Sequence, residues 1–154
     1  MMRIELDKDS YMPGETVKAT VKYSFSSPVS ARKLEASLVC MERKQVKTHT
    51  VMDQDDYRIE KELGIPKSTN IKTETSEQSS TAFSQKKELG GQNIYTNGQA
   101  EVSFELPQDA PATSHEFGHD GKIHVWTLSV KLDIPMAFDK NASKEVFVGG
   151  LLEH

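Results

Sequence analysis

The chain has 154 residues, of which 19 are basic and 23 acidic, so its formal net charge at neutral pH is −4. This length corresponds to one domain, which can bury roughly 70% of the surface that its unfolded chain exposes. Hydrophobic residues make up 36% of the chain, and no stretch approaches the ~20 apolar residues of a membrane helix. The charges are not gathered in a basic cluster, which argues against nucleic-acid binding.

The two ends of the chain and its one cysteine indicate the compartment. Acidic residues at Glu5 and Asp7 interrupt any apolar core of a secretory signal, so we expect a cytoplasmic protein. The single cysteine, Cys40, excludes an internal disulfide framework. Its apolar surroundings predict a buried thiol rather than a nucleophile. The last residues read like the start of a histidine tag, so residues 150–154 are expected to form a tail outside the fold.

Several segments alternate apolar and polar side chains with the period of two that is typical of half-buried β-strands. In chain order the clear ones are residues 17–25, 34–40, 102–106 and 126–134, and weaker ones are 3–8, part of 50–62, 82–89 and 144–148. The last clear segment is the longest and begins apolar on both faces, which predicts a central strand. For the second, a helix with Ala31, Leu34, Leu38 and Met41 on one face is an alternative. We favour a strand there because no good helix cap precedes it.

Turn residues separate these segments. Met12–Pro13–Gly14–Glu15 predicts a type II turn, since proline presets φ at the second position and glycine accepts positive φ at the third. Thr96–Asn97–Gly98–Gln99 predicts a tight reversal, because Asn-Gly is the strongest short hairpin signal. Many short strands without a long helix predict an all-β, immunoglobulin-like antiparallel β-sandwich of about 7–9 strands. We expect one domain over residues 1–149.

Residues 66–80 do not resemble part of a core, because Ile71 is their only large apolar residue. Compact domains rarely contain structureless loops longer than about 12–15 residues, unless the loop is functional or disordered. We therefore expect a long polar loop over about residues 64–82. Two interpretations remain open, a solvated hairpin extension and a loop that binds a partner.

His115–Glu116–Phe117–Gly118–His119 matches the zinc-protease motif H-E-x-x-H. That chemistry needs a helix, which places both imidazoles on one face and the glutamate beside a metal-bound water. Gly118 and the strand expected from about Lys122 leave no room for such a helix. We expect no catalytic, cofactor-binding or metal-binding residues and no cofactor, although His115, His119 and His124 could bind a metal adventitiously.

Three further groups are expected to have structural roles. Asp53, Asp55 and Asp56 form a short acidic cluster, but the spaced ligands and glycine of a calcium loop are missing, so we expect a solvated turn. Phe104 and Trp126 lie on apolar strand faces and are expected in the core. No P-loop, dinucleotide-binding or serine-hydrolase motif occurs.

Five segments together resemble the arrestin-like domain family. They are Tyr11–Val21 (Tyr-x-Pro-Gly-Glu-x-Val), Leu34–Arg43, Phe104–Pro107, Ala110–Thr113 and Ile123–Pro135. The resemblance covers roughly residues 3–149 and implies one arrestin-like sandwich, where arrestins pair two. It places the H-E-x-x-H segment in a loop before a strand.

The resemblance implies a non-enzymatic scaffold or adaptor domain that binds a protein partner. The expected contact surfaces are a sheet edge or the loop over about residues 64–82. Exposed edges also allow a homo-oligomer. Two alternatives stay open: an extracellular immunoglobulin-like or macroglobulin-like module, and, more remotely, a zinc-dependent hydrolase that uses residues 115–119.

Overall fold

The computed structural model describes residues 1–51, 71–118 and 120–149, and these residues form seven β-strands and no helix. Accordingly, no helix in these ranges is long and apolar enough to cross a bilayer. The predicted all-β fold is confirmed. The strands are β1 (Met2–Leu6), β2 (Thr16–Ala31), β3 (Lys33–Val51), β4 (Ile71–Gly90), β5 (Asn93–Glu105), β6 (Lys122–Asp133) and β7 (Lys140–Val146).

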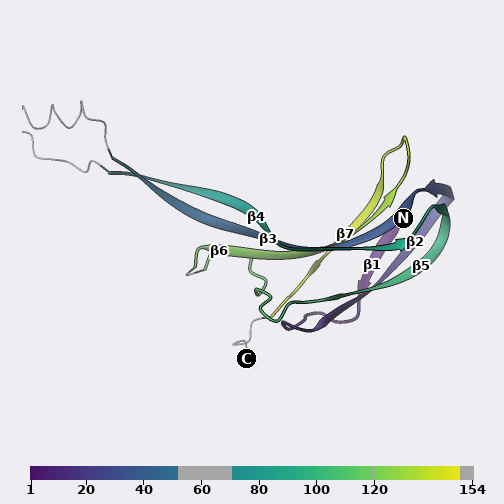
Figure 1. The fold of residues 1–154 in the computed structure, drawn as a ribbon, viewed down its shortest axis with the longest axis horizontal. Coiled ribbons are helices and arrows are strands. Elements are labelled where there is room, and N and C mark those ends of the chain that lie inside the picture. Colours follow the sequence, from purple (N-terminus) through teal and green to yellow (C-terminus); the bar gives the residue numbers. More distant parts are fainter. Residues whose placement is uncertain (52–70, 119, 150–154) are drawn as a thin grey trace, which may run out of the picture.

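The strands form two antiparallel sheets that pack face to face (Figure 1). The three-stranded sheet has the order β1-β2-β5, and the four-stranded sheet has the order β4-β3-β6-β7. A single residue, Arg32, separates β2 from β3, so the chain passes from one sheet to the other there. Strand β6 pairs with β3 on one side and β7 on the other, which confirms the predicted central strand.

The core lies between the sheets and follows the period-two pattern. In β3, the side chains of Leu34, Ala36, Leu38 and Cys40 are all buried, as alternate residues of a strand are when one face is covered. This segment is therefore a strand, and the helical alternative is wrong. Burial raises the pKa of the Cys40 thiol to about 11, so the thiol is neutral at physiological pH. Trp126 and Phe104 are fully buried in this core.

The predicted reversal at residues 96–99 is wrong. These residues lie inside β5, where Asn97 pairs with Ser24 and Gly98 with Tyr23. The reversal occurs earlier, at Gly91 and Gln92 between β4 and β5. Glycine is required at position 98 for another reason, since a Cβ atom there would lie 2.5 Å from the Tyr23 hydroxyl oxygen.

The polar stretch expected as a loop over residues 64–82 is a strand in its second half. Residues 71–82 belong to β4 and run antiparallel to β3, from Val51 opposite Ile71 to Met41 opposite Thr81. Threonine suits a strand whose main-chain groups are paired even where both faces are solvated. Residues 64–70 lie outside the described ranges, as do the acidic cluster at 53–56, most of the expected strand at 50–62, and the tail at 150–154.

Candidate functional site

The H-E-x-x-H segment lies in the connection between β5 and β6, and its described residues are not helical. His119 lies outside the described residues. The Nε2 atom of His115 is 2.9 Å from Oε2 of Glu145 on β7, whereas Nε2 of His124 is 3.2 Å from Oε1 of Glu42 on β3. Each of these two imidazoles thus has its own carboxylate. Within the described ranges, no three potential metal ligands gather in one place.

Glu42 joins β3 to β6 beside the end of the core. Its carboxylate lies 3.4 Å from Nζ of Lys122 as well as close to His124. Partial burial opposes ionisation, but the hydrogen bonds from Lys122 and His124 outweigh it and lower the pKa of Glu42. The carboxylate therefore stays charged at neutral pH and holds the two strands together at this point.

The Tyr-x-Pro-Gly-Glu motif folds as the predicted type II turn. The amide of Glu15 donates to the carbonyl oxygen of Met12 at 3.0 Å, and Gly14 has φ of 83°. A side chain at position 14 would be strained at this φ, and its Cβ would also lie 2.8 Å from Nε2 of Gln108. The positive φ therefore favours glycine at this position, and a larger residue would also have to displace the Gln108 amide.

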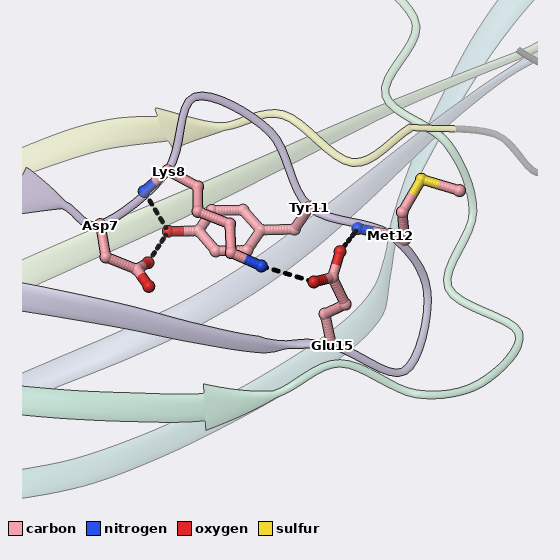
Figure 2. Close-up of polar contacts among 5 residues, drawn as sticks. All are labelled: Asp7, Lys8, Tyr11, Met12 and Glu15. Carbon is pink, nitrogen blue, oxygen red and sulfur yellow. Dashed lines mark hydrogen bonds and ion pairs between the residues drawn. The ribbon is translucent and has the colours of Figure 1, made fainter. Parts of the chain in front are cut away.

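Tyr11 is fully buried beside this turn, and its hydroxyl both donates and accepts a hydrogen bond (Figure 2). The hydroxyl donates to Oδ1 of Asp7 at 2.5 Å and accepts from the amide of Lys8 at 3.3 Å. Burial, aided by the bond to Asp7, raises the pKa of Tyr11 to about 12. The same bond lowers the pKa of Asp7. At neutral pH the pair is therefore a neutral donor bound to a charged acceptor.

Glu15 closes the other side of the same corner (Figure 2). Its carboxylate accepts from Nζ of Lys8 at 2.5 Å and from the amide of Met12 at 2.6 Å. The bond from Lys8 lowers the pKa of Glu15 and raises that of Lys8. Both side chains of the pair remain charged across the physiological pH range.

Main-chain hydrogen bonds attach this corner to two distant parts of the chain. Gly14 donates to the carbonyl oxygen of Pro107 at 3.1 Å, and Leu106 donates to that of Glu15 at 2.9 Å. On the other side, the amide of Tyr11 donates to the carbonyl oxygen of Phe147 at 2.9 Å. The motif thus clamps the end of β5 and the segment after β7. These contacts make the motif a structural corner of the fold.

Strands β3 and β4 continue beyond the rest of the four-stranded sheet as a two-stranded ribbon (Figure 1). Pairing of β3 with β6 ends where Lys44 meets Lys122, and Gln45 makes one more main-chain bond, to Gly121. From residue 46 to residue 51, β3 pairs only with β4. We call residues 46–51 and 71–78 the ribbon. An ion pair between Arg43 and Glu77, 2.5 Å long, crosses its base.

The ribbon is a candidate interaction surface. Its β4 side chains from Thr75 to Gln78 are all exposed, and in the described ranges no further strand pairs with its outer edges. Threonines at positions 73, 75 and 81 fall on one face of a strand and are a sequence signal for β-structure. The lack of apolar residues in this segment made that signal easy to miss. The partner strand that orders this segment lies about 30 residues earlier in the chain, as Thr48 opposite Glu74 shows.

Two facing antiparallel sheets of three and four strands, held by a Tyr-x-Pro-Gly-Glu corner, define an arrestin-like β-sandwich. The chain belongs to the family of arrestin N-terminal domains, because the family model described as "Arrestin (or S-antigen), N-terminal domain" matches residues 2–154.

Among solved structures, the chain is similar to the crystal structure of Spo0M, a sporulation control protein from Bacillus subtilis. The TM-score is 0.61 and the identity 21%, over 97% of this chain and 49% of that one. The similarity shows the fold, and this chain spans about half the length of that protein. The comparison with curated proteins gives no match.

Proposed function

We propose that this domain is a non-enzymatic scaffold or adaptor of the arrestin type, and that a protein partner docks on the ribbon. The observation that carries the proposal is the open edge of β4 along residues 71–78, where β3 is the only neighbouring strand among the residues that the structure describes. An edge strand presents unpaired amide and carbonyl groups, which an extended segment of a partner can pair as an added strand.

The side chains of the ribbon suit such a role. Exposed polar side chains from Thr75 to Gln78 leave the main chain of the edge accessible. The charges of Arg43 and Glu77 at the base are paired with each other, so they contribute little nonspecific attraction.

Two further features support the non-enzymatic, cytoplasmic assignment. His115 and His124 each contact one glutamate, which suits a structural role for both. Cys40 is a free, buried thiol, as is usual in proteins from a reducing compartment.

A ribbon deletion tests the proposal directly. Val46 and Ser76 are opposite each other in the ladder, so an Asn-Gly turn can join them in place of residues 47–75. Immobilised wild-type and deletion proteins would be used to capture partners from a lysate of the source organism, with quantitative mass spectrometry as the readout. We expect proteins that the wild type retains and the deletion variant loses.

The fold of the deletion variant can be checked independently. Every residue of the core cluster lies outside residues 47–75, so the urea midpoint of unfolding should match that of the wild type. Identical capture by both proteins would exclude the ribbon as the docking surface. Failure of the wild type to retain any protein would contradict the interaction function itself.

A further inference from the structure

A groove of about 490 Å³ lies between the edge of β4 and the chain that leaves β5. Phe83, Ser84 and Gln85 of β4 form one wall, and residues 105–108 form the other. The groove belongs to the sandwich, not to the ribbon, and it continues along the same edge of β4. It therefore offers main-chain groups of an edge strand next to the core.

Nζ of Lys87 on β4 donates a hydrogen bond to the carbonyl oxygen of Ser103 on β5, and it lies 5.2 Å from the ring centroid of Phe104. This contact joins the two strands beyond the residues that line the groove.

The groove has an apolar component that can accept a side chain. Phe83 is only partly buried, and its ring centroid lies 5.4 Å from that of the fully buried Trp126. Leu106 is nearly fully buried on the opposite wall, and Pro107 next to it is partly exposed. An apolar side chain placed here would extend the core outward and cover the face of Phe83.

The wall formed by residues 105–108 is held in place before any ligand binds. The carbonyl oxygen of Glu15 accepts a hydrogen bond from the amide of Leu106, and the amide of Gly14 donates one to the carbonyl oxygen of Pro107. The side-chain amide of Gln108 lies directly against Gly14. A preformed wall lowers the ordering cost of binding, so the Tyr-x-Pro-Gly-Glu corner supports this groove.

Glu105 is the charged residue among those that line the groove. It is exposed and forms no ion pair with any residue that the structure describes. The neighbouring cations of β4 are directed elsewhere, since Lys87 bonds to Ser103 and Lys86 lines a separate hollow with Glu35 and Ser37. A ligand with positive charge is therefore complementary.

We infer that this groove binds an extended peptide segment of a partner in which apolar and basic residues alternate. Alternate side chains of a strand point to opposite sides. One set would pack on Phe83 and Pro107, whose side chains are partly exposed, while the other would meet Glu105. The inference rests on the proposed function and names the partner segment that the edge of β4 recognises.

Fluorescence anisotropy with defined peptides tests this inference. The probe is a labelled octapeptide of alternating valine and lysine, titrated with the full chain, and its counterpart carries glutamate in place of lysine. We expect the lysine peptide to bind more tightly. Glu105→Lys should weaken its binding by about three- to tenfold, as expected for loss and reversal of an exposed charge pair, and should strengthen binding of the glutamate peptide.

Glu116→Lys is the matched control. It changes the net charge by the same amount, but Glu116 is exposed beside His115, which contacts β7 at the opposite edge of the sheet. Equal effects of Glu105→Lys and Glu116→Lys would overturn the inference, because binding would then follow net charge alone. No binding of the lysine peptide would overturn it as well.

Hydrogen exchange supplies a readout of strand addition. Binding should slow amide exchange in residues 83–85, and a peptide with proline in place of valine should not, because proline cannot donate to a ladder. Unchanged exchange there would contradict the groove as the site. The ribbon deletion variant should still bind the peptide. Failure of peptide binding would contradict the groove inference, whereas identical partner capture with and without the ribbon would contradict the proposed docking on the ribbon.

Discussion

Trp126 donates its indole Nε1–H to the carbonyl oxygen of Pro111 at 2.9 Å. The ring is fully buried in the central strand β6, whereas Pro111 lies in the connection that leads from β5 to β6. One side chain therefore fills the core and ties the crossing between the sheets to it.

Replacing this side chain is expected to be severe. Trp126→Ala should lower the free energy of unfolding by about 3–5 kcal/mol, the usual cost of deleting a large aromatic core residue. Urea unfolding followed by circular dichroism measures the change. Phe138→Ala is the control, because that ring is 97% exposed and its loss should change stability by less than about 0.5 kcal/mol. A loss below about 1 kcal/mol for Trp126→Ala would contradict the core position.

Gly98→Ala should destabilise the domain by about 1–3 kcal/mol, as overpacking does, because the new Cβ would lie 2.5 Å from the Tyr23 hydroxyl oxygen. Tyr23→Phe removes that oxygen, so the double variant should recover part of the loss. A double-mutant cycle measures the recovery as a coupling energy. Strict additivity of the two changes would show that the residues do not meet.

Gly14→Ala should cost about 1–2 kcal/mol for the left-handed backbone alone, with an additional loss because of the contact with Gln108. Gly121→Ala is a matched comparison. Gly121 also has positive φ, 68°, but its nearest contact would be 3.8 Å away. The difference between the stability losses caused by Gly14→Ala and Gly121→Ala should be smaller in the Gln108→Ala background. An unchanged difference would rule out the Gln108 contact as its cause.

Asp7 should make stability depend on acid pH. The Tyr11 hydroxyl lowers the pKa of Asp7 below its ordinary value of 3.8, so near that pH the unfolded chain binds more protons than the folded one. Its contribution is therefore complete above about pH 5 and lost as the pH falls through the folded pKa. The free energy of unfolding, obtained from urea titrations between about pH 6 and pH 2.5, should fall more steeply for the wild type than for Asp7→Asn. The difference should be less than about 1 kcal/mol, because the group is exposed.

Tyr11→Phe provides the control for this pH dependence. Without this donor, the pKa of Asp7 should return toward its ordinary value, although the backbone hydrogen bonds and Lys8 still lower it. Asp7→Asn should therefore alter the slope less in that background than in the wild type. Equal slopes for the wild type and Asp7→Asn would contradict the role of this hydrogen bond.

Much of the fold was predictable because the relevant signals are local or periodic. The alternation from Val17 to Phe25 and from Trp126 to Leu132 marks strands, since burial of one face imposes a period of two. The turn at Pro13 and Gly14 follows from the φ values that these residues adopt. Burial of Cys40 follows from its apolar neighbours.

The sequence-based predictions were wrong where contacts with residues distant in the chain determine the local structure. Asn97 and Gly98 have the local preference of a turn, yet pairing with Ser24 and Tyr23 keeps them in a strand. Residues 71–82 lack an apolar face, yet β3 supplies their main-chain partners. The groove was not predictable, because one wall, at Phe83, belongs to β4 and the other, at Leu106, belongs to the chain that leaves β5 of the other sheet.

The sequence by itself determined the all-β class, the central position of the Trp126 strand and the type II turn, because side-chain periodicity and backbone preference act over a few residues. Only the tertiary structure decided where the chain reverses, how far β4 extends, and that the Tyr11–Glu15 corner holds the wall of a groove. Those features depend on hydrogen bonds and steric contacts between residues about 30 to 130 positions apart, which no local pattern records.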